Sequence, residues 1–181
     1  EGESHFVRVS EHYPLCGRGD VNTYTIFSET VRLILSSQGY VGIVIPSGIA
    51  TDSTTQYFFD DLVRHGELVS IYDFENRGHI FSALHTKTKF CLFVISKRFH
   101  PAARFAFMCM YISDLTEKGR IFELEPADFA LINPNTRNAP LFRSSRDTEI
   151  TKGIYRHVPI LINEVVPYNL WGISFLAMFH M

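Results

Sequence analysis

The chain has 181 residues, of which 46% are hydrophobic and 20% charged, and its formal net charge at neutral pH is −2. This balance is typical of a folded domain with a sizeable core and excludes a disordered protein. Because the net charge is close to zero, the chain as a whole does not attract nucleic acid. A DNA partner would have to be bound by a local patch or by segments outside this chain.

Cysteine usage and hydropathy narrow the class of protein further. The three cysteines, Cys16, Cys91 and Cys109, are too few and too scattered for a disulfide framework or a zinc site. Cys91 and Cys109 lie in apolar runs, which predicts buried thiols. No apolar run is long enough to span a membrane, and no signal peptide is visible. We therefore expect a cytoplasmic protein with no metal site and no membrane contact.

The first predicted element is a helix that follows an irregular start. The first 20 residues are rich in turn formers and are predicted to be irregular. The helix can be capped by Asp20 or Asn22 and should end by Gly39. Glu29 and Arg32 are three residues apart and are expected to form a weak ion pair on the surface. The apolar residues recur at helical spacing and form one face: Tyr24, Phe27, Val31, Ile34 and Leu35.

A strand and a second helix come next. The run Tyr40–Ile45 is apolar, rich in β-branched residues and bounded by Gly39 and Pro46, which predicts a strand buried on both faces. The following helix should end at Gly66. Its expected caps are Thr51, Asp52 or Ser53, and its expected inward residues are Tyr57, Phe58, Leu62 and Val63. A buried strand between two helices is typical of a parallel α/β sheet.

The next strands are predicted at Glu67–Phe74 and Lys89–Ser96, joined by the polar loop Glu75–Lys87. Because no long crossover separates them, they are expected to be antiparallel neighbours. Arg104–Tyr111 predicts one more strand. The stretch Thr116–Asn138 is expected to be mostly irregular, with a helical turn at Pro126–Leu131. A last helix is expected at Arg146–Val158, capped by Ser144 or Ser145.

Common catalytic motifs are absent from the chain. It has no glycine-rich dinucleotide loop, no phosphate-binding loop, and no zinc-protease or serine-hydrolase motif. His79 and His85 share a loop, but no nearby acid or thiol completes a metal set. Residues 133–136 read Asn-Pro-Asn-Thr, which differs from the Asn/Asp-Pro-Pro-aromatic motif of amino-methylating enzymes. Thr136 cannot stack on a base, so this segment is predicted to be a turn.

Four segments within residues 22–98 follow one another in order: Asn22-Thr-Tyr-Thr-Ile-Phe27 at a helix start, the strand from Gly39 to Pro46, Asp73-Phe-Glu-Asn-Arg-Gly-His-Ile-Phe81 at a strand end, and the strand Phe90–Ile95. In order and spacing they resemble the later motifs of the adenine-specific DNA methyltransferases of restriction-modification systems. Residues 133–159 resemble a segment that follows the catalytic domain in large bacterial methylases.

This resemblance implies an α/β chain with a partial Rossmann-like fold of the S-adenosylmethionine-dependent methyltransferases, followed by a C-terminal extension. Residues 1–98 would be the C-terminal half of the catalytic domain, and residues 99–181 would lead toward the DNA-recognition region. The parent enzyme would transfer a methyl group from S-adenosylmethionine to the exocyclic amino group of a flipped adenine. We expect the chain alone to be inactive, because it lacks the glycine-rich cofactor loop and the Asn-Pro-Pro-aromatic motif.

The resemblance also implies roles for single residues. Phe27 would pack against the adenine ring of S-adenosylmethionine, and Phe81 would stack on the flipped target adenine. Contacts to DNA phosphates would come from Arg77, His85, Lys87 and Lys89 around the same loop. Each role has a plain alternative: Phe27 as a core residue, Phe81 as a cover of the sheet edge, and the cations as a solvated loop. No residue is a candidate nucleophile or general base, and methyl transfer needs none.

The chain starts without methionine and ends on the apolar run WGISFLAMFHM, so we expect a piece of a larger protein. The expected partners are double-stranded DNA, a restriction endonuclease domain or subunit, and a second copy paired through an exposed sheet edge. The alternative is a degenerate methyltransferase-like module that binds DNA or acts as a scaffold without catalysis. A different Rossmann-type nucleotide enzyme would need a donor pocket that the sequence does not show.

Overall fold

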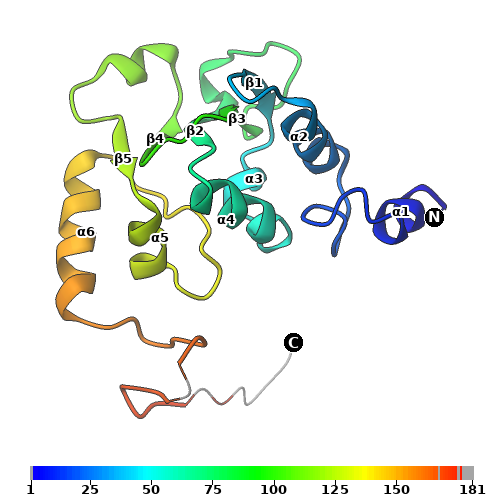
Figure 1. The fold of residues 1–181 in the computed structure, drawn as a ribbon. Coiled ribbons are helices and arrows are strands. Elements are labelled where there is room, and N and C mark those ends of the chain that lie inside the picture. The colour runs from blue at the N-terminus through cyan, green and yellow to red at the C-terminus, as the bar shows by residue number, and fades with distance from the viewer. Residues whose placement is uncertain (1, 167, 175, 177–181) are drawn as a thin grey trace.

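A five-stranded sheet forms the centre of the structure, a computed structural model that describes residues 2–166, 168–174 and 176 (Figure 1). The strands lie in the order β1-β3-β2-β4-β5. β3 is antiparallel to both β1 and β2, β4 is parallel to β2, and β5 is antiparallel to β4. β1, β2 and β4 therefore run in the same direction. The strands span Tyr40–Ile45, Leu68–Glu75, Lys89–Ser96, Ala103–Cys109 and Phe122–Leu124.

Helices cover mainly one face of this sheet (Figure 1). α3, α4 and α5 supply this cover, α2 flanks β1, and α6 packs beside α5 and β5. In the described part of the chain, no helix is long and apolar enough to cross a membrane. The helices span Gly2–Val9, Thr23–Ile34, Gly48–Thr51, Gln56–Arg64, Pro126–Ile132 and Ser145–His157, and the 3-10 turns η1, η2 and η3 span Ser53–Thr55, Asn76–Gly78 and Ile112–Thr116.

The main core lies between α4 and the sheet. Phe58, Phe59 and Leu62 of α4 are fully buried in a cluster that also contains Phe93 of β3 and Phe105 of β4. Tyr57, expected to face inward, is exposed instead. The helix begins at Gln56 after the η1 turn, without a side-chain cap from the residues expected to provide one. This start turns Phe59 inward and Tyr57 outward.

The predicted α/β arrangement with an antiparallel β2–β3 pair is confirmed. The bounds of β3 match the prediction, whereas β4 ends two residues earlier than expected. The strand β5, in a stretch expected to be irregular, was missed because it is only three residues long. α6 is capped by the Ser144 hydroxyl, which accepts the Asp147 N–H at 3.3 Å. β4 and β5 extend the same sheet beyond residue 98, and the domain boundary proposed there stays a prediction.

The N-terminal segment is not wholly irregular, as the sequence suggested, because residues 2–9 form α1. The helix ends where Ser10 N–H donates to the Phe6 carbonyl at 2.9 Å. Val7 of α1 faces residues of α2 across a shared cavity. The proline and glycine residues that favoured a loop all lie beyond this helix, and the short amphipathic stretch before them was overlooked.

The second helix, α2, departs from the expected orientation because it buries polar residues and exposes part of the expected apolar face, whereas Tyr24 and Leu35 pack against the core as expected. Glu29, expected on the surface, is only 2% exposed, and its carboxylate accepts the N–H groups of Leu15 at 3.2 Å and Cys16 at 2.8 Å. Phe27 and Ile34 are 52% and 77% exposed. The expected surface pair of Glu29 with Arg32 is therefore wrong, since both side chains are buried against other partners.

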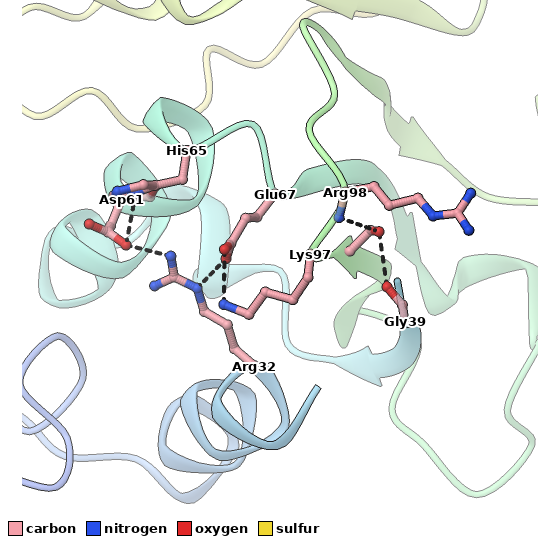
Figure 2. A network of polar contacts seen from close by, with 8 residues as sticks. Arg32, Gly39, Asp61, His65, Glu67, Lys97 and Arg98 are labelled. Carbon is pink, nitrogen blue, oxygen red and sulfur yellow. Dashed lines mark hydrogen bonds and ion pairs between the residues drawn. The ribbon is translucent and has the colours of Figure 1, made fainter. Parts of the chain in front are cut away.

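Arg32 sits in a network that joins α2 to the rest of the fold (Figure 2). Its guanidinium contacts Asp61 of α4 at 2.5 Å and Glu67 at 2.6 Å, and Lys97 reaches Glu67 at 2.9 Å. Burial raises the pKa of Glu67, but the hydrogen bonds from Lys97 and Arg32 outweigh it and lower the pKa below its ordinary value. This network holds a polar helix face inside the protein.

β1 was predicted to be buried on both faces, and this is wrong. The strand lies at the outer edge of the sheet, and Tyr40 and Val44 on one face are exposed. The helices cover the opposite face, so the apolar side chains of β1 are buried on one face of the sheet only. The apolar end of the chain lies partly outside the described residues, at positions 175 and 177–181.

We predict that Arg32→Met destabilises the protein by about 2 kcal/mol, because it removes the buried cation that joins Asp61 to Glu67 and leaves Glu67 with Lys97 alone. Arg64→Met is the matched control, since Arg64 is exposed and its pair with Asp60 spans one helical turn. The control should change the free energy of unfolding by less than about 0.5 kcal/mol. Urea denaturation measures both. Equal effects of the two substitutions would show that the network is not a stabilising contact.

We also predict a pH signature for Glu67. Because its pKa is lowered in the folded state, its stabilising contribution is present above the ordinary value of 4.5 and is lost as the pH falls through the folded pKa. Glu67→Gln should lower the melting temperature at pH 7, and the difference from the wild type should shrink as the pH falls below 4.5 and through the folded pKa of Glu67. Thermal unfolding between pH 7 and pH 3 measures this difference. A constant difference over the whole range would contradict it.

Candidate functional site

The three parallel strands end at one edge of the sheet. Ile45 of β1 and Asp73 of β2 both lie opposite Cys91 of β3, and Phe74 lies opposite Cys109 of β4. The segments that follow these strands, residues 46–55, 76–88 and 110–116, therefore gather at the same edge. Open α/β sheets bind their ligands beyond the carboxyl ends of the strands. This edge is the candidate site.

A buried carboxylate ties the three strand ends together. Asp73 is only 6% exposed. The Ser47 hydroxyl, after β1, donates to one of its oxygens, and Met108 N–H, in β4, donates to the other at 3.1 Å. Asp73 is thus fixed by its neighbours and acts as a structural acceptor.

Met108 marks a bulge in β4. The register between β2 and β4 shifts between Tyr72 and Phe74, and Met108 has a φ of 59°. This left-handed conformation is costly for a residue other than glycine and persists only where neighbouring groups enforce it. Here Asp73 holds the N–H of Met108, and Arg120 donates to its carbonyl at 2.7 Å. The bulge is therefore held by hydrogen bonds to both the N–H and the carbonyl group of Met108.

The loop after β2 carries Phe81 and is organised by Asn76. The buried Asn76 amide donates to the carbonyls of Phe81 at 2.9 Å and Leu84 at 3.0 Å, and its oxygen accepts the Phe81 N–H at 3.0 Å. The Phe81 ring lies edge-on to Phe90, with centroids 4.9 Å apart, and Phe90 stacks on Phe74. Phe81 is 40% exposed. One side of its ring is thus supported and the rest is accessible.

The four predicted DNA contacts, Arg77, His85, Lys87 and Lys89, are all exposed and lie in or beside this loop. Arg77 pairs with Glu75 at 2.8 Å, and the His85 ring accepts the N–H of Lys87 at 3.2 Å. Within the described residues, no carboxylate pairs with either lysine. The structure therefore brings these cations together with Phe81, while their contacts to phosphate stay a prediction.

Phe27 lies on another element, in the first half of α2. It lines a cavity of about 410 Å³ between α1 and α2, together with Val7, Val21 and Ile26. The reading of Phe27 as a core residue is wrong, because the ring is about half exposed. None of the described residues that line this cavity belongs to the Phe81 loop, and the cofactor role of Phe27 stays a prediction.

A second, polar cavity of about 530 Å³ opens at the start of α2. Tyr24 and Asp52 line it together with several hydroxyl side chains. Burial, and then the charge of Asp52, raise the pKa of Tyr24 to about 12, so its phenol stays protonated at neutral pH. The first cavity is lined mainly by apolar side chains, and the second by carboxylate and hydroxyl groups. Both lie beside the first turn of α2.

The cysteines take no part in this chemistry. All three are buried, and desolvation raises the pKa of each thiol. A protonated, buried thiol is neither a nucleophile nor a metal ligand at neutral pH. This finding confirms the burial expected for Cys91 and Cys109.

Sequence reasoning missed three residues of this edge: Asp73, Asn76 and Arg120. Asp73 is a charge within an apolar strand, and this break in the pattern was a usable signal. Asn76 is flanked by other polar loop residues, so the sequence pattern does not distinguish it as a buried residue. Arg120 lies in a stretch expected to be irregular, although it is 6% exposed and holds the bulge from the opposite side.

No protein-family model matches the chain, and no curated protein matches it. The chain is similar in structure to solved proteins, two of which are described next. The type IIG restriction endonuclease BpuSI aligns with a TM-score of 0.50 and 12% identity over 71% of this chain and 18% of its own. The methyltransferase subunit of a type I restriction-modification system from Streptococcus thermophilus aligns with a TM-score of 0.52 and 13% identity over 77% of this chain and 35% of its own.

The chain has a fold like that of a restriction-modification methyltransferase. This confirms the partial Rossmann-like fold predicted from the sequence. At 12% and 13% identity the likeness concerns the fold alone. The chain spans about a fifth and about a third of the two proteins, at 18% and 35% of their lengths.

We predict that Asp73→Ala destabilises the protein by about 2 kcal/mol, because it removes the acceptor of two part-buried hydrogen bonds, those from the Ser47 hydroxyl and the Met108 N–H. Glu123→Ala is the matched control, since it removes an exposed carboxylate from β5. The control should stay within about 0.5 kcal/mol of the wild type. Chemical denaturation measures both. A loss no larger than that of the control would show that Asp73 does not hold the strand ends.

Proposed function

We propose that this chain is the later part of the catalytic domain of a DNA adenine methyltransferase in a restriction-modification system. The parent protein would methylate the exocyclic amino group of an adenine flipped out of double-stranded DNA. The observation that carries the proposal is Phe81, an accessible aromatic ring on a loop fixed by Asn76, at the carboxyl end of a methyltransferase-like sheet.

In this proposal Phe81 stacks on the flipped adenine. Stacking of a base on an aromatic side chain contributes roughly 1–3 kcal/mol, which helps to offset the cost of unstacking the base. Phe90 supports the ring from behind, so little side-chain entropy is lost when the base arrives. The exposed Lys87 and Lys89 would hold phosphates beside the flipped nucleotide and position it without reading sequence.

The cofactor would bind along α2. The ring of Phe27 and its apolar cavity suit an adenine ring, and the polar cavity beside Tyr24 and Asp52 suits ribose hydroxyls. S-adenosylmethionine, when bound, supplies the methyl group. Its positively charged sulfur would make the methyl carbon electrophilic enough to pass to an amino nitrogen without a covalent intermediate on this chain. Such a transfer needs positioning of the amine, which agrees with buried, protonated cysteines and the absence of an activated nucleophile among the described residues.

The exposed apolar surface supports the view that other segments complete the domain. Leu33 and Ile34 on α2 and Val44 on β1 are exposed, and β1 forms an edge of the described sheet. Apolar residues gathered beside an open edge usually mark an interface. We infer that the rest of the catalytic domain covers this surface, that the chain alone is inactive and self-associates there, and that the parent acts with a restriction endonuclease domain or subunit.

The test is S-adenosylmethionine binding, measured by calorimetry on this chain and on the gene product extended upstream by about 200 residues, one domain's length. Binding by the extended protein alone is expected. Phe27→Ala in that protein should weaken binding roughly 10-fold, because it removes one stacking surface. Phe99→Ala, which removes an exposed ring just beyond β3, is the control and should leave binding unchanged.

Binding by the 181-residue chain alone would contradict the split of the cofactor site. Binding by neither protein would favour a degenerate module that has lost catalysis. Where the extended protein binds, transfer of a labelled methyl group to adenine in DNA decides the reaction. Transfer to cytosine instead would contradict the proposed specificity.

A further inference from the structure

The segment that follows β4 lies directly against the Phe81 loop. A Cβ added to Gly78 would collide with the Met110 carbonyl and would meet the Tyr111 ring at 3.0 Å, so only glycine fits at this contact. Ile80 from the Phe81 loop and Leu115 from η3 also pack against the same small buried cluster. The two segments therefore form one continuous structure at the edge of the sheet.

The backbone of Tyr111 is fixed, and part of its ring lies against Gly78. The Asp114 carboxylate accepts the N–H of Met110 at 2.7 Å and that of Tyr111 at 3.1 Å. The clamped bulge at Met108 fixes the chain just before this turn. Nevertheless the Tyr111 side chain is 56% exposed. An aromatic ring held out on a rigid backbone binds a flat partner at a low cost in conformational entropy.

We propose that Tyr111 is a second nucleic-acid contact of this site and stacks on a nucleotide next to the flipped adenine. The inference rests on the proposed function, because Phe81 is taken as the platform for the flipped base itself. Exposed cations on the adjoining loop, Arg77, Lys87 and Lys89, supply the charge that a phosphate backbone needs. Bases of any sequence present a π face, so Tyr111 would add affinity without specificity.

The test uses this chain and two fluorescein-labelled probes read by fluorescence anisotropy. One probe is a single-stranded oligodeoxyadenylate of about eight nucleotides, within the usual site size for such surfaces. The other has the same length and charge but carries abasic sites in place of the adenines. The variants are Tyr111→Ala, Tyr111→Leu, Tyr111→Phe, Phe81→Ala and Phe99→Ala.

Tyr111→Ala and Tyr111→Leu should each weaken binding of the oligodeoxyadenylate roughly 10-fold, within the range expected for loss of one stacked base. Tyr111→Leu keeps an apolar side chain against Gly78, so it separates stacking from folding. Tyr111→Phe should bind like the wild type, and Phe99→Ala should be neutral. Binding of the abasic probe should not change with any Tyr111 variant.

Two results would overturn the inference while leaving the proposed function intact. One is that Phe81→Ala weakens binding of the oligodeoxyadenylate while Tyr111→Ala has no effect on it. The other is equal weakening of both probes by the Tyr111 variants, which would mean that the residue supports the fold or contacts phosphate. No binding by the wild type, or no effect of either aromatic, would count against the proposed function and the inference together.

Discussion

The candidate site depends on one carboxylate placed where three parallel strands end. Asp73 accepts hydrogen bonds from the segments that follow β1 and from the bulge in β4, so it fixes the relative positions of elements distant in sequence. The loops that carry Phe81 and Tyr111 both begin within a few residues of these contacts. A buried carboxylate is costly unless its acceptor sites are filled, and here both oxygens are filled. Any displacement of these segments would leave the buried Asp73 carboxylate without a donor, so burial of Asp73 favours a single arrangement of the sheet edge.

The orientation of α2 links stability to function in a second way. Glu29 and Arg32 hold the helix to the domain through polar contacts, and Leu33 and Ile34 stay exposed. In an isolated globular domain an amphipathic helix usually turns its apolar residues inward and its charges outward. The outward apolar residues of α2 are those to which the proposed function assigns a further partner. Phe27 lies on the outward side.

The order of most elements could be predicted from the sequence, because apolar runs such as Lys89–Ser96 and turn residues such as Gly66 carry local signals. The buried side of α4 could also be predicted, but that of α2 could not. Periodicity identifies an apolar face of α2 but cannot say that Arg32 finds two carboxylates inside, since Asp61 and Glu67 come from other elements. The same holds at the site: Phe81 was predicted from its motif, whereas the support from Asn76 depends on tertiary contacts.

The place of β3 in the sheet has a consequence for how the protein is made. Among the strands of the described sheet β1 is synthesised first, and its partner there is β3, so the ribosome adds residues 46–96 before this pair can form. At about 5–20 residues per second this interval lasts several seconds. Meanwhile the β2–β3 hairpin can form locally as soon as it emerges and offers an edge to which β1 returns. The newly made strand is therefore the part of the described chain most exposed to wrong pairing, and the part for which a chaperone would matter most.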